Sequence, residues 1–185
     1  MAATPSTMLA LGTRLPEFAL IDTVSGRRFS DSDFKAKGGL LVVFICNHCP
    51  FVVHIRHELV KVAAEALDAG LGVIAINSNS VESHPQDGPS HMKELAKSEG
   101  WPFPYLFDET QAVAKVFDAA CTPDIFLFDA DFKLAYRGQF DDSRPSNGKP
   151  VTGVDLRAAI AAVVAKAPVS PEQKPSIGCN IKWKS

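Results

Sequence analysis

The sequence predicts an α/β fold in which a central mixed β-sheet is flanked by helices. Short apolar runs, typical of strands buried on both faces, alternate with segments whose apolar residues recur every three or four positions, typical of amphipathic helices. The alternation ends in a strand–turn–strand pattern and a last helix, which favours a mixed sheet. With 185 residues, of which 46% are hydrophobic, the chain can bury one core but is short for two domains.

The elements expected in the first half of the chain build the centre of the sheet. Apolar segments at 18–21 and 28–29 flank a turn signal, which predicts an N-terminal hairpin. Residues 40–45 are apolar on both faces, as in a central strand. Residues 50–69 place apolar side chains opposite charged ones at helical spacing and predict an amphipathic helix. A second apolar strand is expected at 71–77.

The second half of the chain adds an insertion and a second hairpin. A helix from Ser90 is expected in a segment inserted after the second central strand. The other expected elements are strands at 105–107, 125–129 and 134–137 and helices at 109–117 and 154–166. We therefore expect a single domain at 12–166, preceded by a tail at 1–11. Residues 167–185 are expected to form an extended strap, because several prolines exclude a helix at its start.

Composition and charge argue against several classes of partner. A formal net charge of −2 and a pI near 6.2, without a long Lys/Arg cluster, argue against nucleic acid. No run reaches membrane-spanning length, and residues 1–12 lack the basic start and long apolar stretch of a signal peptide. We therefore expect a cytoplasmic protein with no membrane partner. Four cysteines are too few for a disulfide scaffold, so a CxxC pair here indicates catalysis or metal binding.

The most informative motif is Cys46-Asn47-His48-Cys49, directly after the first central strand. At a strand-to-helix junction the first cysteine meets unpaired backbone N–H groups and the positive end of the helix dipole, which favour the thiolate. We therefore expect Cys46, as the more exposed thiol, to be the nucleophile and Cys49 to resolve it. Asn47 and His48 are expected to tune the pair, because an imidazole can stabilise a thiolate by charge or hydrogen bonding.

Further motifs connect this pair to a known family. They read CNHCP at 46–50, CTPD at 121–124, YRG at 136–138 and GCNIKWK at 178–184. With the lead-in LPEF and the inserted segment, they resemble the thioredoxin-like superfamily, in its peroxiredoxin-like branch of AhpC/TSA and TlpA-like proteins. The likeness covers roughly residues 12–166. The four motifs are similar to those of a set of peroxiredoxin-like proteins of unassigned function.

The resemblance implies a thioredoxin-like fold with a supporting loop beside the cysteine pair. It implies a cis bond between Thr122 and Pro123, the kind of peptide bond for which cis is least costly. It also implies that this loop offers backbone hydrogen bonds to an extended substrate. Thr122 and Pro123 are therefore expected to support the reaction at Cys46 and Cys49.

Two further cysteines each allow two interpretations. Cys121, two residues before Pro123, is either a small buried side chain or a third redox thiol near the pair. Cys179 lies in the C-terminal motif, in a segment without an obvious core role. It is either an incidental cysteine in a docked tail or a resolving or regulatory thiol.

The peroxiredoxin pattern is only partly present. Peroxiredoxins place Thr or Ser three residues before a peroxidatic cysteine that itself precedes proline. Here Cys49 precedes Pro50, but Cys46 occupies the hydroxyl position. If the protein is a peroxidase, Cys49 is therefore the candidate peroxidatic thiol and Cys46 its resolver.

The acids that related proteins use as proton acceptors are absent from their usual positions. Thioredoxin carries an acid in the strand before its CxxC, where this chain has Leu40, and TlpA-like reductases carry one where this chain has Val52. Proton transfer is then expected to rely on water, His48 or Lys182.

The other histidines give no clear site. His54 and His57 lie within a polar stripe, which favours a solvated helix face over a pair of metal ligands. His84 and His91 lie in the inserted segment, and the sequence identifies no partner for either.

These observations predict a thiol–disulfide oxidoreductase that cycles Cys46 and Cys49 in an antioxidant or redox-maintenance role, without a cofactor. The alternatives are a thiol peroxidase and a soft-metal (Zn or Cu) binding module built on the CxxC; a lone CxxC is weak support for zinc. Expected partners are protein or small-molecule disulfides, peroxides in the alternative, and a thiol reductant system. We expect a monomer or a homodimer.

Overall fold

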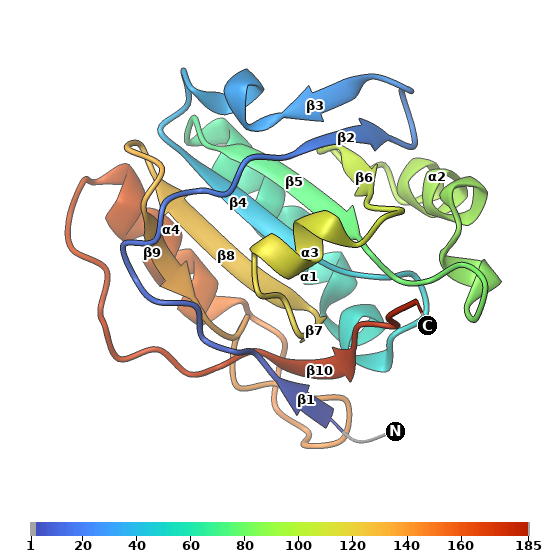
Figure 1. Cartoon of the computed structure of the whole chain (residues 1–185). Coiled ribbons are helices and arrows are strands. Elements are labelled where there is room, and N and C mark those ends of the chain that lie inside the picture. The colour runs from blue at the N-terminus through green and yellow to red at the C-terminus, as the bar shows by residue number, and fades with distance from the viewer. Residues whose placement is uncertain (1–2, 185) are drawn as a thin grey trace.

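A seven-stranded mixed sheet forms the centre of the structure, a computed structural model that describes residues 3–184. Its strand order is β3-β2-β6-β5-β4-β8-β9, as Figure 1 shows. The strands are β2 (Ala19–Asp22), β3 (Arg28–Ser30), β4 (Gly39–Phe44), β5 (Gly72–Asn77), β6 (Tyr105–Phe107), β8 (Asp124–Asp129) and β9 (Leu134–Arg137). β5 runs parallel to β4 and β6, and the other neighbours are antiparallel. The predicted α/β fold with a mixed sheet is confirmed.

Helices cover both faces of this sheet because its central strands are apolar on both faces. In β4, Leu41 and Val43 pack into one core cluster, and Leu40 and Val42 pack into the other. Helices α1, α2 and α4 contribute to the first cluster and α3 to the second. The helices are α1 (Pro50–Asp68), α2 (Pro89–Ser98), α3 (Ala112–Val116) and α4 (Val154–Val164), with short 3-10 helices η1 (Asp31–Phe34) and η2 (Pro85–Asp87). No helix in the described part of the chain is long and apolar enough to cross a membrane.

A second, three-stranded sheet joins the two ends of the chain. It consists of β1 (Ala3–Pro5), β10 (Ile177–Asn180) and β7 (Cys121–Thr122), with β10 in the middle and both pairings antiparallel. The predicted tail at 1–11 and the predicted extended strap at 167–185 thus each contribute one strand to this sheet. Strands form there because β10 satisfies the backbone groups of both neighbours, so the two chain ends lie side by side in Figure 1.

The helix expected at 109–117 is shorter than its sequence pattern indicates. It occupies only Ala112–Val116, because Gln111 adopts a left-handed conformation with φ 63°. The buried Asp108 carboxylate accepts the backbone N–H of Ala114 at 2.9 Å, so a side chain satisfies one of the unpaired groups at the start of the helix.

Strand β10 approaches the loop before β8 so closely that a side chain would not fit. A Cβ atom built at Gly178 overlaps the backbone carbonyl oxygen of Thr122 and lies 3.0 Å from the backbone nitrogen of Pro123. Both obstacles are backbone atoms, so they cannot swing aside as a flexible side chain could. Glycine at this position therefore allows the C-terminal strand to dock beside Thr122.

We predict that Gly178→Ala lowers the free energy of unfolding by about 1–3 kcal/mol, the usual cost of overpacking. Gly38→Ala is the matched control, because a Cβ atom there meets only the Gly70 carbonyl oxygen at 3.8 Å. Urea denaturation of both variants and the wild type measures the difference. An equal loss of stability in the two variants would contradict the close packing of β10.

Candidate functional site

The dithiol lies in the loop between β4 and α1, ahead of the helix. Cys49 is the N-cap residue of α1 and Pro50 occupies the first turn, where its missing N–H costs nothing. The expectation that Cys46 sits at the helix N-terminus is therefore wrong, because Pro50 makes the helix start after the pair. Cys46 and Cys49 are 2% and 0% exposed, so exposure does not distinguish an attacking thiol.

The loop before β8 contacts both thiols of the pair. The bond between Thr122 and Pro123 is cis, as the family resemblance implies. When it is protonated, the Cys49 thiol donates a hydrogen bond to the carbonyl oxygen of Thr122, 3.0 Å away. The Cys46 sulfur lies 3.5 Å from the hydroxyl oxygen of the same threonine. Thr122 therefore fixes the positions of both sulfur atoms.

A third thiol reaches the pair from the C-terminal strand. Cys179 on β10 stands opposite Thr122 in the antiparallel register, and its interaction with Cys49 lowers the pKa of the Cys49 thiol. Cys49 thus has a thiol neighbour on each side, Cys46 and Cys179. Cys121 is buried, and its thiol donates to the Pro123 carbonyl oxygen at 3.5 Å, as expected of a small buried side chain.

The thiols of this cluster differ in pKa, because interactions within the cluster lower that of Cys49 and raise those of Cys46 and Cys179. The hydrogen bond from the Cys46 thiol lowers the pKa of Cys49 most, with help from Cys179 and the Val52 backbone N–H and against the effect of burial. The same hydrogen bond, together with burial and the nearby Asp87 carboxylate, raises the pKa of Cys46. Burial followed by the hydrogen bond to Cys49 raises the pKa of Cys179 to about 12. The arrangement therefore favours one thiolate, held by two thiols.

The carboxylate nearest to Cys46 is Asp87, which our sequence prediction missed. Asp87 is 0% exposed and lies in η2 of the inserted segment. Its two carboxylate oxygens accept the Asn47 backbone N–H at 2.9 Å and the Asn79 side-chain amide at 2.8 Å. His48 Nδ1 lies 2.8 Å from Asp87 and 4.0 Å from the Cys46 sulfur. The missing acids at the usual positions are thus replaced by one from another part of the chain.

The inserted segment also provides a partner for the histidine of the motif. The His84 ring stacks on the His48 ring with centroids 5.1 Å apart and planes at 19°. The sequence identifies no partner for His84, and the structure provides one because η2 folds back over the dithiol loop. The Tyr105 hydroxyl donates to the side-chain oxygen of Asn47 at 3.0 Å, which fixes the other residue between the two cysteines.

Cys46, His48 and Asp87 offer the donor set of a soft-metal site. One ligand atom from each lies within 4.8 Å of the others. However, the Asp87 oxygens already accept hydrogen bonds from Asn47 and Asn79, and the raised pKa of Cys46 opposes loss of the proton that a metal ligand must release. The ligand atoms are therefore present, but hydrogen bonds and a proton within the protein occupy them.

Other candidate residues lie away from the thiols or serve different roles. The Lys182 ammonium group donates to the carbonyl and side-chain oxygens of Asn180 at 2.8 and 3.0 Å. His57 and His91 are exposed, as a solvated helix face predicts for His57. His54 differs from that prediction, because its Nε2 atom is buried and has no hydrogen-bond partner within residues 3–184.

Comparisons with solved structures place the chain beside proteins of the same architecture. An uncharacterized conserved protein from Geobacillus kaustophilus is 53% identical, with 100% of this chain and 97% of that chain covered and a TM-score of 0.97. A hypothetical protein from Sinorhizobium meliloti is 50% identical, with 98% and 99% covered and a TM-score of 0.96. A peroxidoxin from Mycobacterium tuberculosis, 17% identical over 84% of this chain and 96% of that chain with a TM-score of 0.60, shares the fold.

The family follows from a match over most of the chain. Comparison with curated proteins found no match. A family model described as Redoxin matches residues 10–152, which include the dithiol, the cis-proline loop and the inserted segment. The chain therefore belongs to the Redoxin family and has a thioredoxin-like fold.

Proposed function

We propose that this protein is a thiol–disulfide oxidoreductase in which Cys49 is the attacking thiolate and Cys46 the resolving thiol. The observation that carries the proposal is the placement of the Cys49 sulfur between two thiol donors at the start of α1, which lowers its pKa. This order reverses the one that the position of Cys46 in the motif suggests. The reason is physical, since Asp87 disfavours a second negative charge at Cys46.

The proposed reaction with a small disulfide balances in two steps. The Cys49 thiolate attacks one sulfur of the substrate, so that a mixed disulfide forms and the other substrate sulfur leaves as a thiolate. Cys46 then loses its proton and attacks the Cys49 sulfur, which forms the Cys46–Cys49 disulfide and releases the second substrate thiolate. We assign Asp87 as the final acceptor of the Cys46 proton, relayed through His48 Nδ1, which lies 4.0 Å from that sulfur and 2.8 Å from the carboxylate and gives its own proton to Asp87 and takes that of Cys46. A thiol reductant reverses both steps.

Burial of the thiols favours small substrates over extended peptides. Cys46, Cys49 and Cys179 are 2%, 0% and 4% exposed. The backbone of Thr122, which the family resemblance assigns to an extended substrate, is already paired with Cys179 of β10. Protein disulfides would have to displace β10, whereas small-molecule disulfides would not. The thiol reductant system, the antioxidant role and the cytoplasmic location stay predictions from the sequence.

A thiol peroxidase is the second candidate, and the burial of the thiols is the observation that favours it. Peroxides are among the smallest oxidants, and Cys49 precedes Pro50 as in peroxiredoxins. In that reaction the Cys49 thiolate attacks a peroxide oxygen, an alcohol or water leaves, and Cys49 becomes a sulfenic acid. Cys46 then attacks the Cys49 sulfur, water leaves, and the same disulfide forms.

We predict that Cys46→Ser accumulates a mixed disulfide at Cys49 when it is treated with bis(2-hydroxyethyl) disulfide. Cys49→Ser should react about tenfold more slowly, because burial and the Asp87 carboxylate still raise the pKa of Cys46 after the hydrogen bond to Cys49 is lost, and one pKa unit is a tenfold change in thiolate. Mass spectrometry after rapid acid quenching identifies the modified residue in each variant. Cys121→Ala is the control with an intact pair. Modification of Cys46 in Cys49→Ser at the wild-type rate would contradict the assigned order.

The oxidoreductase and peroxidase candidates differ in the oxidant that forms the disulfide fastest. We expect reduced wild-type protein to form the Cys46–Cys49 disulfide with bis(2-hydroxyethyl) disulfide more rapidly than free dithiothreitol reacts with that disulfide. Stopped-flow measurements of the rate of disulfide formation with this compound and with hydrogen peroxide, at equal concentrations, give the comparison. A preference for peroxide of more than about 100-fold, a difference of about 2.7 kcal/mol in activation free energy, would favour the peroxidase instead.

We predict that Cys179→Ala raises the pKa of Cys49 by about one unit, because a hydrogen bond to a charged group contributes about 1.5 kcal/mol. The pH dependence of Cys49 alkylation by iodoacetamide measures the shift, so the reactive form should appear at higher pH in the variant. Cys179→Ser, whose hydroxyl can still donate, should recover most of the effect, and Cys121→Ala should show none. An unchanged profile in Cys179→Ala would show that β10 does not tune the dithiol.

A further inference from the structure

A groove beside the dithiol contains a cation that no carboxylate of the described chain neutralises. Arg144 lies in the loop between β9 and α4, and no carboxylate oxygen of residues 3–184 is within 4.0 Å of its guanidinium nitrogens. Its Nη1 donates to the carbonyl oxygens of Asp141 and Ser143, at 2.7 and 2.6 Å, and its Nη2 donates to the side-chain oxygen of Gln139 at 2.6 Å. All three acceptors are uncharged, so they orient the side chain without neutralising its positive charge.

Two N–H groups of Arg144 remain for a ligand. A guanidinium has five N–H donors, and the hydrogen bonds within the protein use both at Nη1 and one at Nη2. The N–H at Nε and one at Nη2 have no acceptor in the described residues. Guanidinium groups bind carboxylates through such paired donors, with higher affinity and better-defined geometry than a single hydrogen bond provides. An oriented Arg144 is thus suited to bind an anion.

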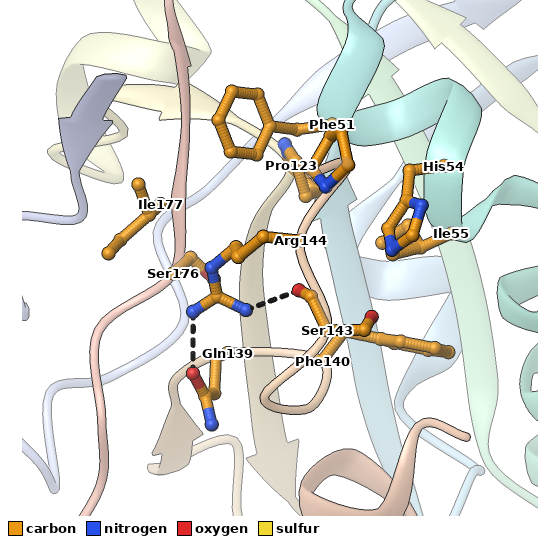
Figure 2. A pocket seen from close by; sticks show the side chains of 11 residues that line it. Phe51, His54, Ile55, Pro123, Gln139, Phe140, Ser143, Arg144, Ser176 and Ile177 are labelled. Atoms are coloured by element: carbon orange, nitrogen blue, oxygen red, sulfur yellow. Dashed lines mark hydrogen bonds between the residues drawn. The ribbon is translucent and has the colours of Figure 1, made fainter. Parts of the chain in front are cut away.

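The space around Arg144 is an open groove with a small recess at one end. The groove, about 440 Å³, is lined mainly by Pro50, Phe51, Pro145 and Ile177 in addition to Arg144. The recess, about 20 Å³, lies between Pro123, His54 and Arg144 and has room for a group the size of one water molecule. Figure 2 shows Arg144 among the residues that line this recess, with Phe51 and Pro123 above it, Gln139 below it and His54 at the right.

A buried polar atom in the recess also points to a ligand. His54 lines the recess, and its Nε2 atom is buried without a hydrogen-bond partner in the described residues. An unpaired buried nitrogen is costly, so an atom that accepts or donates a hydrogen bond is expected in the recess. A carboxylate held by Arg144 would bring an oxygen to this end of the groove.

The groove is continuous with the residues that hold the thiols. Pro50, which lines the groove, directly follows Cys49. Pro123, which lines the recess, directly follows Thr122, and Thr122 contacts both sulfur atoms of the pair. A ligand in the groove therefore lies next to the residues that flank the dithiol, and neither thiol itself lines the groove or the recess. The walls of the groove are mostly apolar, and Arg144 is the one cation among the described residues that line it, which fits a short molecule with a hydrocarbon portion and one anionic end.

We propose that this groove binds a low-molecular-weight disulfide that carries a carboxylate, with the carboxylate on Arg144 and the disulfide directed towards Cys49. The proposal rests on the oxidoreductase function proposed above and names its substrate class. Arg144 is a specificity residue in this scheme, because it binds the end of the substrate that does not react. The disulfide is reduced to two thiols as Cys46 and Cys49 are oxidised, so the electrons balance as in the two steps given above.

Three disulfides that differ in their end groups test the proposal. They are 3,3′-dithiodipropionate with carboxylates, bis(2-hydroxyethyl) disulfide without charge, and cystamine with ammonium groups. Second-order rate constants for oxidation of the reduced protein are divided by those of free dithiothreitol, which corrects for the reactivity of each compound. We expect dithiodipropionate to be preferred over the neutral disulfide by about tenfold, the effect of one charge-assisted contact, and cystamine to react most slowly.

Variants of the groove identify the source of this preference. Arg144→Gln should remove the preference for dithiodipropionate over the neutral disulfide, and Arg144→Lys should keep part of it because it retains the charge but not the paired donors. Lys149→Gln is the matched control, since Lys149 is an exposed cation of the same loop that pairs with Asp142. Thermal unfolding of each variant shows whether the fold is intact. The rate constant with the neutral disulfide shows whether the dithiol still reacts normally.

Binding of suberate, a dicarboxylate of similar length without a disulfide, gives a readout independent of redox chemistry. We expect suberate to bind the wild type and Lys149→Gln but not Arg144→Gln, with NMR shifts centred on Arg144 and His54. Equal corrected rates for the three disulfides, or suberate binding unaffected by Arg144→Gln, would overturn the proposal while leaving the oxidoreductase function standing. Suberate binding without reduction of any disulfide would instead overturn the proposed function.

Discussion

The site depends on the contact of Thr122 with three cysteines at once. Its carbonyl and hydroxyl oxygens lie against Cys49 and Cys46, and its backbone pairs with Cys179. This contact requires the strand of the C-terminal motif to lie against the loop, and Gly178 provides the space because any Cβ atom would overlap the Thr122 carbonyl. The arrangement of the thiols and the docking of the chain ends therefore depend on the same contact at Thr122.

Electrostatics then determines which sulfur carries charge. A buried cluster of thiols supports one negative charge far more readily than two, because each further charge loses solvation and repels the first. Asp87 is a second source of negative potential. It is buried, its carboxylate contacts His48 beside Cys46, and it raises the pKa of Cys46. The thiolate that we propose is therefore Cys49, which has thiol donors and the start of α1 around it and no carboxylate against its sulfur in the described residues.

Local patterns in the sequence were sufficient for the core but not for the site. The strands β4 and β5 and the helix α1 were predictable because their apolar residues lie close together in sequence and bury on defined faces. The CxxC and the cis-proline loop were predictable as motifs. The role of Asp87 was not, because nothing near it in sequence indicates that η2 folds over the dithiol. Arg144 was missed for the same reason, since a loop arginine acquires significance only from the neighbours that the fold provides.

The same reasoning explains how this chain can lack both acids that its relatives use. An acid in the strand before the CxxC, at Leu40, or in the first turn of α1, at Val52, would enter a fully buried apolar cluster. Placing the carboxylate on η2 avoids that cost, because backbone and side-chain amides from Asn47 and Asn79 already surround Asp87. These hydrogen bonds offset part of the cost of burying the carboxylate, and His48 lies between it and the sulfur of Cys46. The inserted segment is therefore part of the redox site and not an addition to the surface of the domain.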